Sequence, residues 1–245
     1  MHEAQMHEHN AYITLTYANE HLPEHGQLIH RHFQLFMKRL RKHFTGEKIK
    51  YYMCGEYGAK ERRPHFHACL FGIDFQDKTA WQKNDNGDQL YRSQRLEQLW
   101  PYGHSTTGNV TFKSAAYIAR YVMKKINGDL AKKHYEKLDI TTGEIIRLKP
   151  EYNKMSLAQG IGKTWIQKYM TDVYPHGKVV ANRVEVTPPK YYDLQFKKLN
   201  ADAMESLQHQ REMEGKARYK DNTQARLDVK EQVLKAKAAL LKRKI

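Results

Sequence analysis

Cysteine, proline and long apolar runs are scarce in this sequence. Its 245 residues include two cysteines and seven prolines, and no apolar run is long enough to span a bilayer. No secretory signal is recognisable at the start of the chain, so we expect a cytoplasmic protein that does not act in a membrane. With so few thiols, Cys54 and Cys69 are expected to be free and partly buried, and a single cross-strand disulfide is the lesser alternative.

Acidic residues are few relative to basic ones. Forty-two Lys and Arg against 27 Asp and Glu leave a formal net charge of +15. Such an excess predicts a polyanionic partner, with nucleic acid ahead of a membrane surface. Sixteen tyrosines and three tryptophans supply rings that could stack on bases, although most aromatic side chains in any protein belong to its core.

The spacing of apolar residues predicts an α+β fold. Alternation and β-branched residues indicate a first strand at 11–17, and a basic amphipathic helix follows at 29–44. Two further strands, 49–56 and 65–72, are joined by an eight-residue connection compatible with a hairpin. Further expected elements are a helical piece at 92–100, a strand at 110–112, a helix at 114–126 capped by Ser114, a helix at 163–174 and a strand at 178–186.

Composition divides the chain into a folded domain, residues 1–192, and a basic helical arm, residues 193–245. Within the first part, residues 74–109 are polar and rich in Gly, Asn and Asp, which predicts a mobile insertion. Residues 128–152 are expected to form a charged extension. The chain begins with MHEAQMHEHN, which resembles the inside of a helix, so we expect a truncated start.

Two histidines in the strand RPHFHACLFG are the first candidate site. Successive strand side chains point to opposite faces at about 3.3 Å per residue, so His65 and His67 emerge on one face about 6.6 Å apart. The eight-residue connection can place Glu56 opposite them on the neighbouring strand. Two imidazoles and a carboxylate suit Mg²⁺ or Mn²⁺ when phosphate oxygens complete the shell, and Zn²⁺ is also compatible. A lone His-x-His pair is more often packed or solvated than bound to metal.

A second candidate site lies on the helix AAYIARYVMKK. Tyr117 and Tyr121 are four residues apart and therefore share a face, and each has a cation three residues later, Arg120 and Lys124. Two tyrosines at this spacing commonly pack in a core. Beside a metal they could instead act as nucleophiles, because a nearby cation favours the phenolate and a metal makes phosphorus easier to attack. Arg120 and Lys124 would bind phosphate or lower a tyrosine pKa.

Two common motifs are excluded by spacing. His2 and His7 are five residues apart, whereas the zincin motif H-E-x-x-H needs four. The stretch GIGKT lacks the earlier glycine of a P-loop, since Leu157 stands in its place. No cofactor other than the metal is expected.

These motifs together resemble the HUH endonucleases, named for His, hydrophobic, His, and within them the rolling-circle replication initiators of microviruses, in particular the gokushovirus branch. The likeness runs from about Tyr12 to Tyr192. It covers AYITLTY with the following HLP, CGEYG with RPHFHACLFG, AAYIARYVMKK, GIGKTWIQKYMTDVYP and TPPKYY. The resemblance implies an antiparallel sheet of about five strands with flanking helices, a metal under one sheet face, and a helix that presents tyrosine to it.

The resemblance also implies an activity. Members nick one DNA strand, leaving a 5′-phosphotyrosine link and a free 3′-OH, and rejoin it, which starts rolling-circle replication. We therefore expect a metal-dependent tyrosine endonuclease and strand transferase that acts on a single-stranded DNA origin in the cytoplasm of a bacterial host, with host helicase and polymerase as candidate partners. Arg120 stands where single-tyrosine relatives commonly have lysine, so which tyrosine attacks first stays open. The alternatives are a relaxase or transposase with the same chemistry and a non-catalytic single-strand binder.

Overall fold

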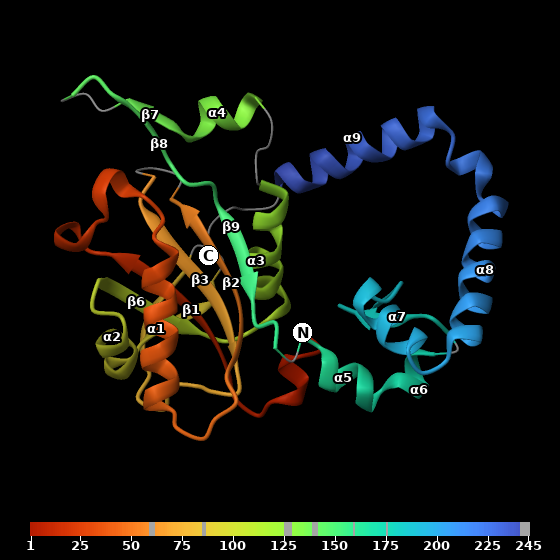
Figure 1. The fold of residues 1–245 in the computed structure, drawn as a ribbon, viewed down its shortest axis with the longest axis horizontal. Coiled ribbons are helices and arrows are strands. Elements are labelled where there is room, and N and C mark those ends of the chain that lie inside the picture. The colour runs from red at the N-terminus through yellow and green to blue at the C-terminus, as the bar shows by residue number, and fades with distance from the viewer. Residues whose placement is uncertain are drawn as a thin grey trace. The chain divides into compact units, whose positions relative to one another are not determined.

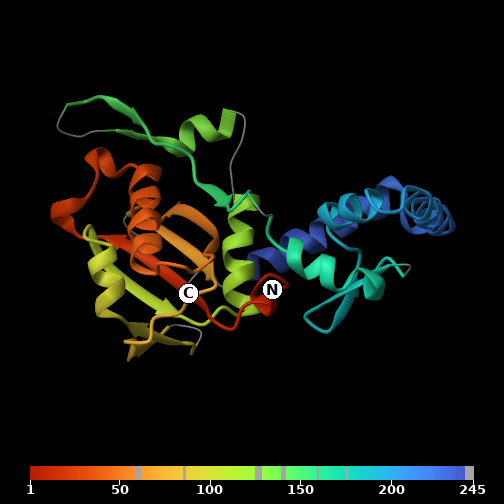
Figure 2. The same cartoon turned by 60° about the horizontal axis from the view of Figure 1, so that its bottom comes forward.

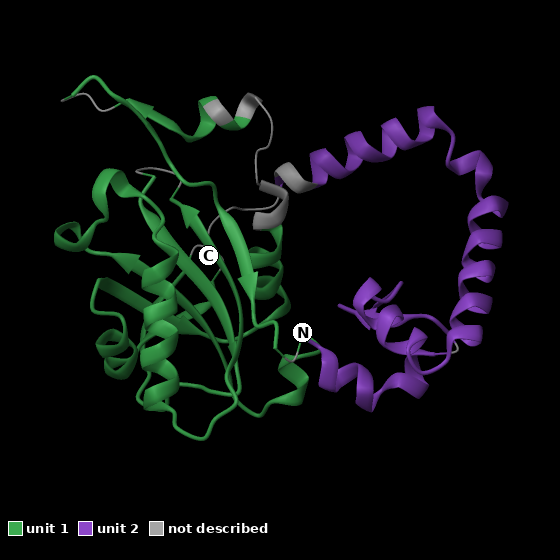
Figure 3. Cartoon of the chain, in the orientation of Figure 1, with its two compact units in different colours: residues 1–161, 245 green, residues 162–244 purple. Residues whose placement is uncertain are grey.

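A computed structural model of the chain describes residues 1–58, 62–84, 87–124, 129–138, 142–158, 160–174 and 176–240. Contacts divide it into two compact units, Met1–Ile161 and Gly162–Lys244 (Figure 3). The sequence-based division between residues 192 and 193 concerns the extent of the nicking domain and stays a prediction. Among the helices that the structure describes, none combines the length and apolar character that a membrane crossing needs.

The first unit is built on a seven-stranded antiparallel sheet (Figure 1). Its strands, in sheet order, are β4 (Thr79–Lys83), β5 (Gln89–Arg92), β6 (Gly103–Gly108), β1 (Asn10–Tyr17), β3 (Pro64–Phe71), β2 (Lys50–Tyr57) and β9 (Tyr152–Met155). The predicted α+β class is confirmed, and the arrangement is consistent with an HUH endonuclease-like fold. The sheet has seven strands where about five were expected, because the hairpin of β4 and β5 extends it.

Helices cover both faces of this sheet (Figure 2). On one face lie α1 (His30–His43) and α2 (Gln94–Leu99), and on the other lies α3 (Phe112–Lys124). The basic helix predicted at 29–44 is α1, whose buried residues are Phe33, Phe36, Met37 and Leu40. The remaining described elements are α4 (Asp129–Tyr135) and the ribbon of β7 (Glu136–Leu138) and β8 (Ile145–Arg147), all within the expected charged extension.

Strand alternation assigns each residue of β3 to one of two cores. Phe66, Ala68 and Leu70 are fully buried against α1 and its neighbours. The other core, beside α3, contains Cys69 and Ile118, and it is on this α3 side that the histidines of β3 emerge. The predicted one-face arrangement of the histidines with an apolar backing is therefore confirmed. Cys54 and Cys69 are free and buried, also as predicted.

Residues 74–109 contribute regular structure, which corrects the expected insertion. In the described part of this segment, β4, β5, α2 and β6 are ordered elements, and β6 pairs with β1 from Tyr12↔Gly108 to Tyr17↔Gly103. The sequence GHSTTG of β6 lacks the apolar alternation of a half-buried strand, so periodicity could not find it. The strand expected at 110–112 is wrong, because α3 already begins at Phe112.

Two smaller predictions also need correction. Ser114 lies inside α3, and the residue that caps the helix is Thr111, whose Oγ1 accepts from the Ser114 N–H at 3.2 Å. The strand expected at 178–186 is a hairpin, β10 (Val179–Ala181) and β11 (Val184–Val186). Asn182 and Arg183 both have positive φ, 50° and 66°, which is the two-residue turn geometry that hairpins favour.

Gly103 joins β6 to the end of β1, and this position requires glycine. Its φ is +151°, and a Cβ there would lie 2.2 Å from the Ala18 nitrogen and 2.5 Å from the Thr16 oxygen. Because both are backbone atoms, a side chain must push the strands apart. We expect Gly103→Ala to lower the free energy of unfolding by about 2–4 kcal/mol, measured by urea denaturation.

Gly46→Ala is the matched control. Gly46 has a φ of +91°, but no atom lies within 4 Å of the position that a Cβ would take there, so this variant isolates the backbone cost of about 1 kcal/mol. Equal decreases in the free energy of unfolding of the two variants would contradict the steric explanation.

The second unit has its own small core. It contains α5 (Lys163–Lys168), α6 (Met170–Val173), β10, β11, α7 (Lys190–Lys197), α8 (Ala201–Ala217) and α9 (Gln224–Leu240). Met204 and Leu207 of α8 are buried with Ile166, Val173 and Tyr192. Every side chain described in α9 is exposed, so the long solvated helices predicted after Leu194 are confirmed.

Candidate metal and tyrosine site

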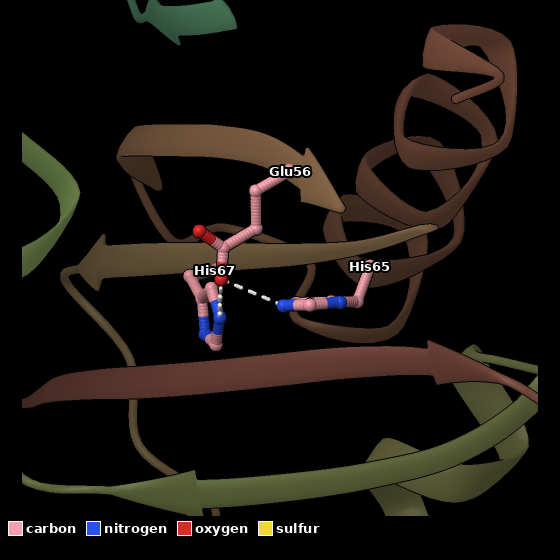
Figure 4. Close-up of side chains that lie close together, drawn as sticks. All are labelled: Glu56, His65 and His67. Atoms are coloured by element: carbon pink, nitrogen blue, oxygen red, sulfur yellow. Dashed lines mark hydrogen bonds and ion pairs between the residues drawn. The ribbon is translucent and has the colours of Figure 1, made fainter. Parts of the chain in front are cut away.

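The hairpin of β2 and β3 brings together the three residues predicted as metal ligands. Its register places Glu56 opposite His65 and Cys54 opposite His67, so all three ligand side chains project from one face. Their ligand atoms lie within 4.8 Å of one another. Figure 4 shows both imidazoles turned toward the same carboxylate oxygen. Glu56, His65 and His67 thus form a group that could hold a metal ion.

Three donors converge on one oxygen of Glu56. Its Oε1 lies 2.6 Å from His65 Nε2, 2.9 Å from His67 Nε2 and 2.9 Å from the hydroxyl of Tyr117. Burial raises the pKa of Glu56, but hydrogen bonds from the two histidines outweigh it and hold the pKa at about 2. The carboxylate is therefore ionised throughout the physiological range.

The second oxygen of Glu56 is buried and has no hydrogen-bond partner among the residues that the structure describes. A buried carboxylate oxygen without a partner is costly in a native protein unless something else satisfies it. Two imidazole nitrogens and a carboxylate are a donor set that Mn²⁺ accepts, and Mg²⁺ accepts it when phosphate oxygens contribute. The residues therefore fit the predicted divalent cation, whose identity stays a prediction.

Neighbouring groups fix how each histidine presents its nitrogen. His65 Nδ1 lies 3.0 Å from the backbone oxygen of Arg63, which can only accept, so Nδ1 carries the proton and Nε2 faces Glu56. His67 Nδ1 lies 2.8 Å from the Tyr12 hydroxyl and 2.9 Å from Thr14 Oγ1. Such partners orient metal-binding imidazoles and select their tautomer.

Sequence reasoning did not identify Tyr12 and Thr14 as site residues. Alternation along β1 places both on one face, but only the register, which pairs Tyr12 with Cys69 and Thr14 with His67, shows that they reach the histidine. Arg63 was likewise not singled out, because its contribution to the site is a backbone oxygen.

Tyr12 and Thr14 should support metal binding through His67. The double variant Tyr12→Phe, Thr14→Val removes both hydroxyls while keeping the packing volume, and we expect Mn²⁺ affinity to fall about 10- to 100-fold, measured by calorimetry. Tyr52→Phe is the control, since Tyr52 also lies in β2 beside this core but contacts Asn153. Unchanged affinity in the double variant would show that the hydroxyls do not orient His67.

Helix α3 carries Tyr117 to this cluster. The backbone oxygen of Ile118 accepts from Asn153 Nδ2 on β9 at 2.7 Å, and Ile118 is fully buried under the helix. Tyr117 is 5% exposed, and its ring lies edge-on to His67 with centroids 5.1 Å apart. The structure thus joins the first predicted tyrosine to the predicted metal ligands.

The protonation of Tyr117 differs from the sequence-based expectation. Burial above all, followed by the charge of Glu56 and the hydrogen bond to it, raises the pKa of Tyr117 well above its usual range. Arg120 lowers it, as expected of a cation, but with a smaller effect. Without metal, Tyr117 is therefore a neutral phenol that donates to Glu56. Tyr121 and Lys124 lie on α3, but their side chains are outside the described residues, so their roles stay predictions.

Comparison with known proteins connects this site to phage replication. Residues 10–126 match the model of the replication-associated protein ORF2 family. The chain is 34% identical to the replication-associated protein VP4 of Bdellovibrio phage phiMH2K over 206 residues, which cover 80% of this chain and 61% of that protein. It is 32% identical to the replication-associated protein ORF2 of Spiroplasma virus 4 over 198 residues, covering 76% and 57%.

A third relative, the replication-associated protein ORF4 of Chlamydia phage 1, is 29% identical over 212 residues, covering 83% of this chain and 50% of its own length. The chain thus spans about half to three fifths of these curated relatives. No solved structure matches it. The matches are consistent with the resemblance to gokushovirus-like initiators, and through residues 10–126, which carry both histidines, Glu56 and both tyrosines, the chain belongs to the replication-associated protein ORF2 family.

Proposed function

We propose that this protein nicks and rejoins single-stranded DNA at an origin through a 5′-phosphotyrosine intermediate, and so starts rolling-circle replication in the cytoplasm of a bacterial host. The observation that carries the proposal is the 2.9 Å hydrogen bond between the Tyr117 hydroxyl and the Glu56 oxygen that His65 and His67 also contact. A nucleophile beside a candidate cation site is what transfer of a phosphoryl group to tyrosine requires. Names of phage relatives support the replication context.

The proposed reaction exchanges one phosphodiester for another. The Tyr117 oxygen forms a bond to phosphorus, and the bond from phosphorus to the 3′ oxygen breaks. The phenol loses its proton and the leaving oxygen gains one, which yields a free 3′-OH. Because the bond energy is kept in the tyrosine link, a 3′-OH can later reverse the step without ATP.

Glu56, His65 and His67 would hold the divalent cation. When bound, Mg²⁺ or Mn²⁺ supplies positive charge that polarises the phosphate and offsets charge on the leaving oxygen. Since Glu56 Oε1 is also the acceptor for Tyr117, the hydroxyl must leave this carboxylate before it attacks. Arg120, which is partly exposed, would then face phosphate, where a guanidinium forms strong hydrogen bonds.

Tyr121 would serve as a second nucleophile. It follows Tyr117 by one helical turn, so both could approach one site in turn. A cycle that ends by transfer to a newly copied origin needs a second acceptor while the first still holds DNA. Lys124 stands three residues after Tyr121, and we assign it phosphate binding.

Covalent capture tests the proposal. The protein is incubated with single-stranded DNA labelled on the 3′ side of the cleavage point, with Mn²⁺ or with EDTA. We expect label to stay with the protein through denaturation only with Mn²⁺. A non-catalytic single-strand binder would retain no label, and a hydrolytic nuclease would cut without retaining it.

The basic end of the arm should add sequence-independent affinity. Residues 222–245 contain seven Lys and Arg against two Asp and Glu, whereas Met204 and Leu207 of α8 belong to the second unit's core, so truncation after Asp221 spares that core. We expect the slope of log affinity against log salt to become shallower by about 0.7 for each phosphate that the arm neutralises, measured by fluorescence anisotropy. An unchanged slope would indicate a solvated or protein-binding helix.

A further inference from the structure

A small pocket lies at the end of the hairpin that carries the metal ligands. It has a volume of about 80 Å³. Four basic side chains, His25, Arg62, Arg63 and Lys137, line it together with apolar residues that include Leu22 and Leu148. None of its eight lining residues is acidic. All of them belong to the first unit, although they come from three separate stretches of the chain.

Contacts within the pocket hold two of the cations in place and leave one available. Arg62 donates to the backbone oxygen of His134 at 2.8 Å and lies over the Tyr57 ring. Arg63 donates to the backbone oxygen of Tyr17 at 2.9 Å. Lys137 is exposed and has no hydrogen-bond or ion-pair partner within the described part of the chain. The one ion pair near the rim, between His25 and Glu24, involves a carboxylate that is 89% exposed.

Backbone conformation also marks this pocket. His25 and Arg62 have φ of 56° and 49°, in the left-handed region that residues other than glycine seldom adopt. Strained non-glycine residues persist where the surrounding structure determines them, and they cluster at binding sites. Here the two strained residues face the same small space.

The size of the pocket limits what it can hold. At about 80 Å³ it has the liquid volume of two to three water molecules at ~30 Å³ each, far below the ~300 Å³ of a typical small-molecule site. A base, a nucleoside triphosphate or an organic cofactor is too large. A single phosphate group, with its charge met by the surrounding cations, fits both the volume and the electrostatics.

Arg63 links this pocket directly to the candidate metal site. Its guanidinium group lines the pocket, while its backbone oxygen accepts from His65 Nδ1 at 3.0 Å. Arg63 and His65 are two residues apart, a separation of about 6.6 Å along a strand. A DNA strand with one phosphate at the metal ligands therefore has a neighbouring phosphate within reach of the pocket.

We propose that this pocket binds a phosphate of the single-stranded DNA next to the one that is cleaved, with Lys137 and Arg62 as its charged contacts. The proposal rests on the proposed function, since it names a subsite for the same substrate. Its role is to set the register of the strand on the metal ligands, because a phosphate held here determines which neighbour reaches Tyr117. Phosphate contacts of this kind position nucleic acid without reading its sequence.

Binding of the oligonucleotide dT₁₂ in EDTA tests the pocket without any cleavage. Lys137→Gln should weaken binding about fivefold and make the salt slope shallower by about 0.7, whereas Lys137→Arg should restore both. Lys83→Gln is the matched control, because Lys83 is an exposed lysine on β4, two strands beyond β6 in the sheet. Equal effects of Lys137→Gln and Lys83→Gln would overturn the proposal.

Titration with inorganic phosphate locates the site. Amide NMR signals of Gly26 and Arg62 should shift in the full-length protein and stay unmoved in the Lys137→Gln variant. Shifts that are equal in both proteins, or confined to other residues, would overturn the subsite. Neither measurement needs nicking, so a protein that fails to form an adduct can still pass them, and a protein that nicks can still fail them.

Discussion

Replacing both tyrosines of α3 with phenylalanine should abolish the covalent capture of DNA. Phe keeps the ring and removes the oxygen, so the packing of α3 should change little, while the adduct rate falls by at least about 1,000-fold. Either single variant should keep some cleavage of a simple oligonucleotide, with unequal loss. Transfer to a second origin should suffer in both single variants, because closing the cycle needs two nucleophiles.

The structure adds an asymmetry to this series. Tyr117→Phe also removes one of three donors to Glu56 Oε1, so it should change Mn²⁺ affinity as well as cleavage. Tyr91→Phe on β5 controls for loss of a phenol elsewhere in the sheet. Wild-type adduct formation by the double Phe variant would refute the tyrosine assignment and direct the search to another of the 16 tyrosines or to water.

Removing either metal-binding histidine should abolish nicking while sparing DNA binding. His65→Ala or His67→Ala takes one ligand from a set of three, and we expect nicking to fall at least about 100-fold. Binding of single-stranded DNA should stay within about twofold, because Lys and Arg contacts to phosphates dominate affinity. Gel shift in EDTA and cleavage in Mn²⁺ measure the two quantities separately.

Thermal unfolding gives these variants a second readout. Wild-type protein should gain stability with added Mn²⁺, since a ligand of the folded state raises Tm, and the two variants should lose that gain. His104→Ala is the matched control, because His104 is an exposed histidine on β6. Undiminished cleavage, or an equal loss of DNA binding, would count against the metal role.

Local patterns in the sequence predicted the half of the site that lies on one hairpin. The spacing of His65 and His67, and the short connection back to Glu56, determine which side chains share a face, because alternation and hairpin pairing act over a few residues. Tyr117 could be placed on a helix face in the same way. That its hydroxyl reaches Glu56 depends on α3 packing against β2, β3 and β9, which no local pattern specifies.

The parts that sequence reasoning missed depend on pairing between distant segments. Tyr12 and Thr14 reach His67 only through the register of β1 with β3. The polar strand β6 lies inside the sheet because Gly103 lets the chain approach β1 closely, not because its own residues favour a strand. The raised pKa of Tyr117 likewise follows from burial beside Glu56, whereas the sequence shows only the neighbouring cation.

Mapping the DNA adduct to a peptide tests the central claim most directly. Trypsin cuts after Lys113, Arg120 and Lys124, so it separates Tyr117, in SAAYIAR, from Tyr121, in YVMK. After reaction with single-stranded DNA and Mn²⁺, followed by nuclease trimming, we predict that a nucleotide-phosphate mass is attached to one or both of these peptides and is absent with EDTA or in His67→Ala. An adduct on a peptide outside α3, or none at all while the DNA is cut, would contradict the account.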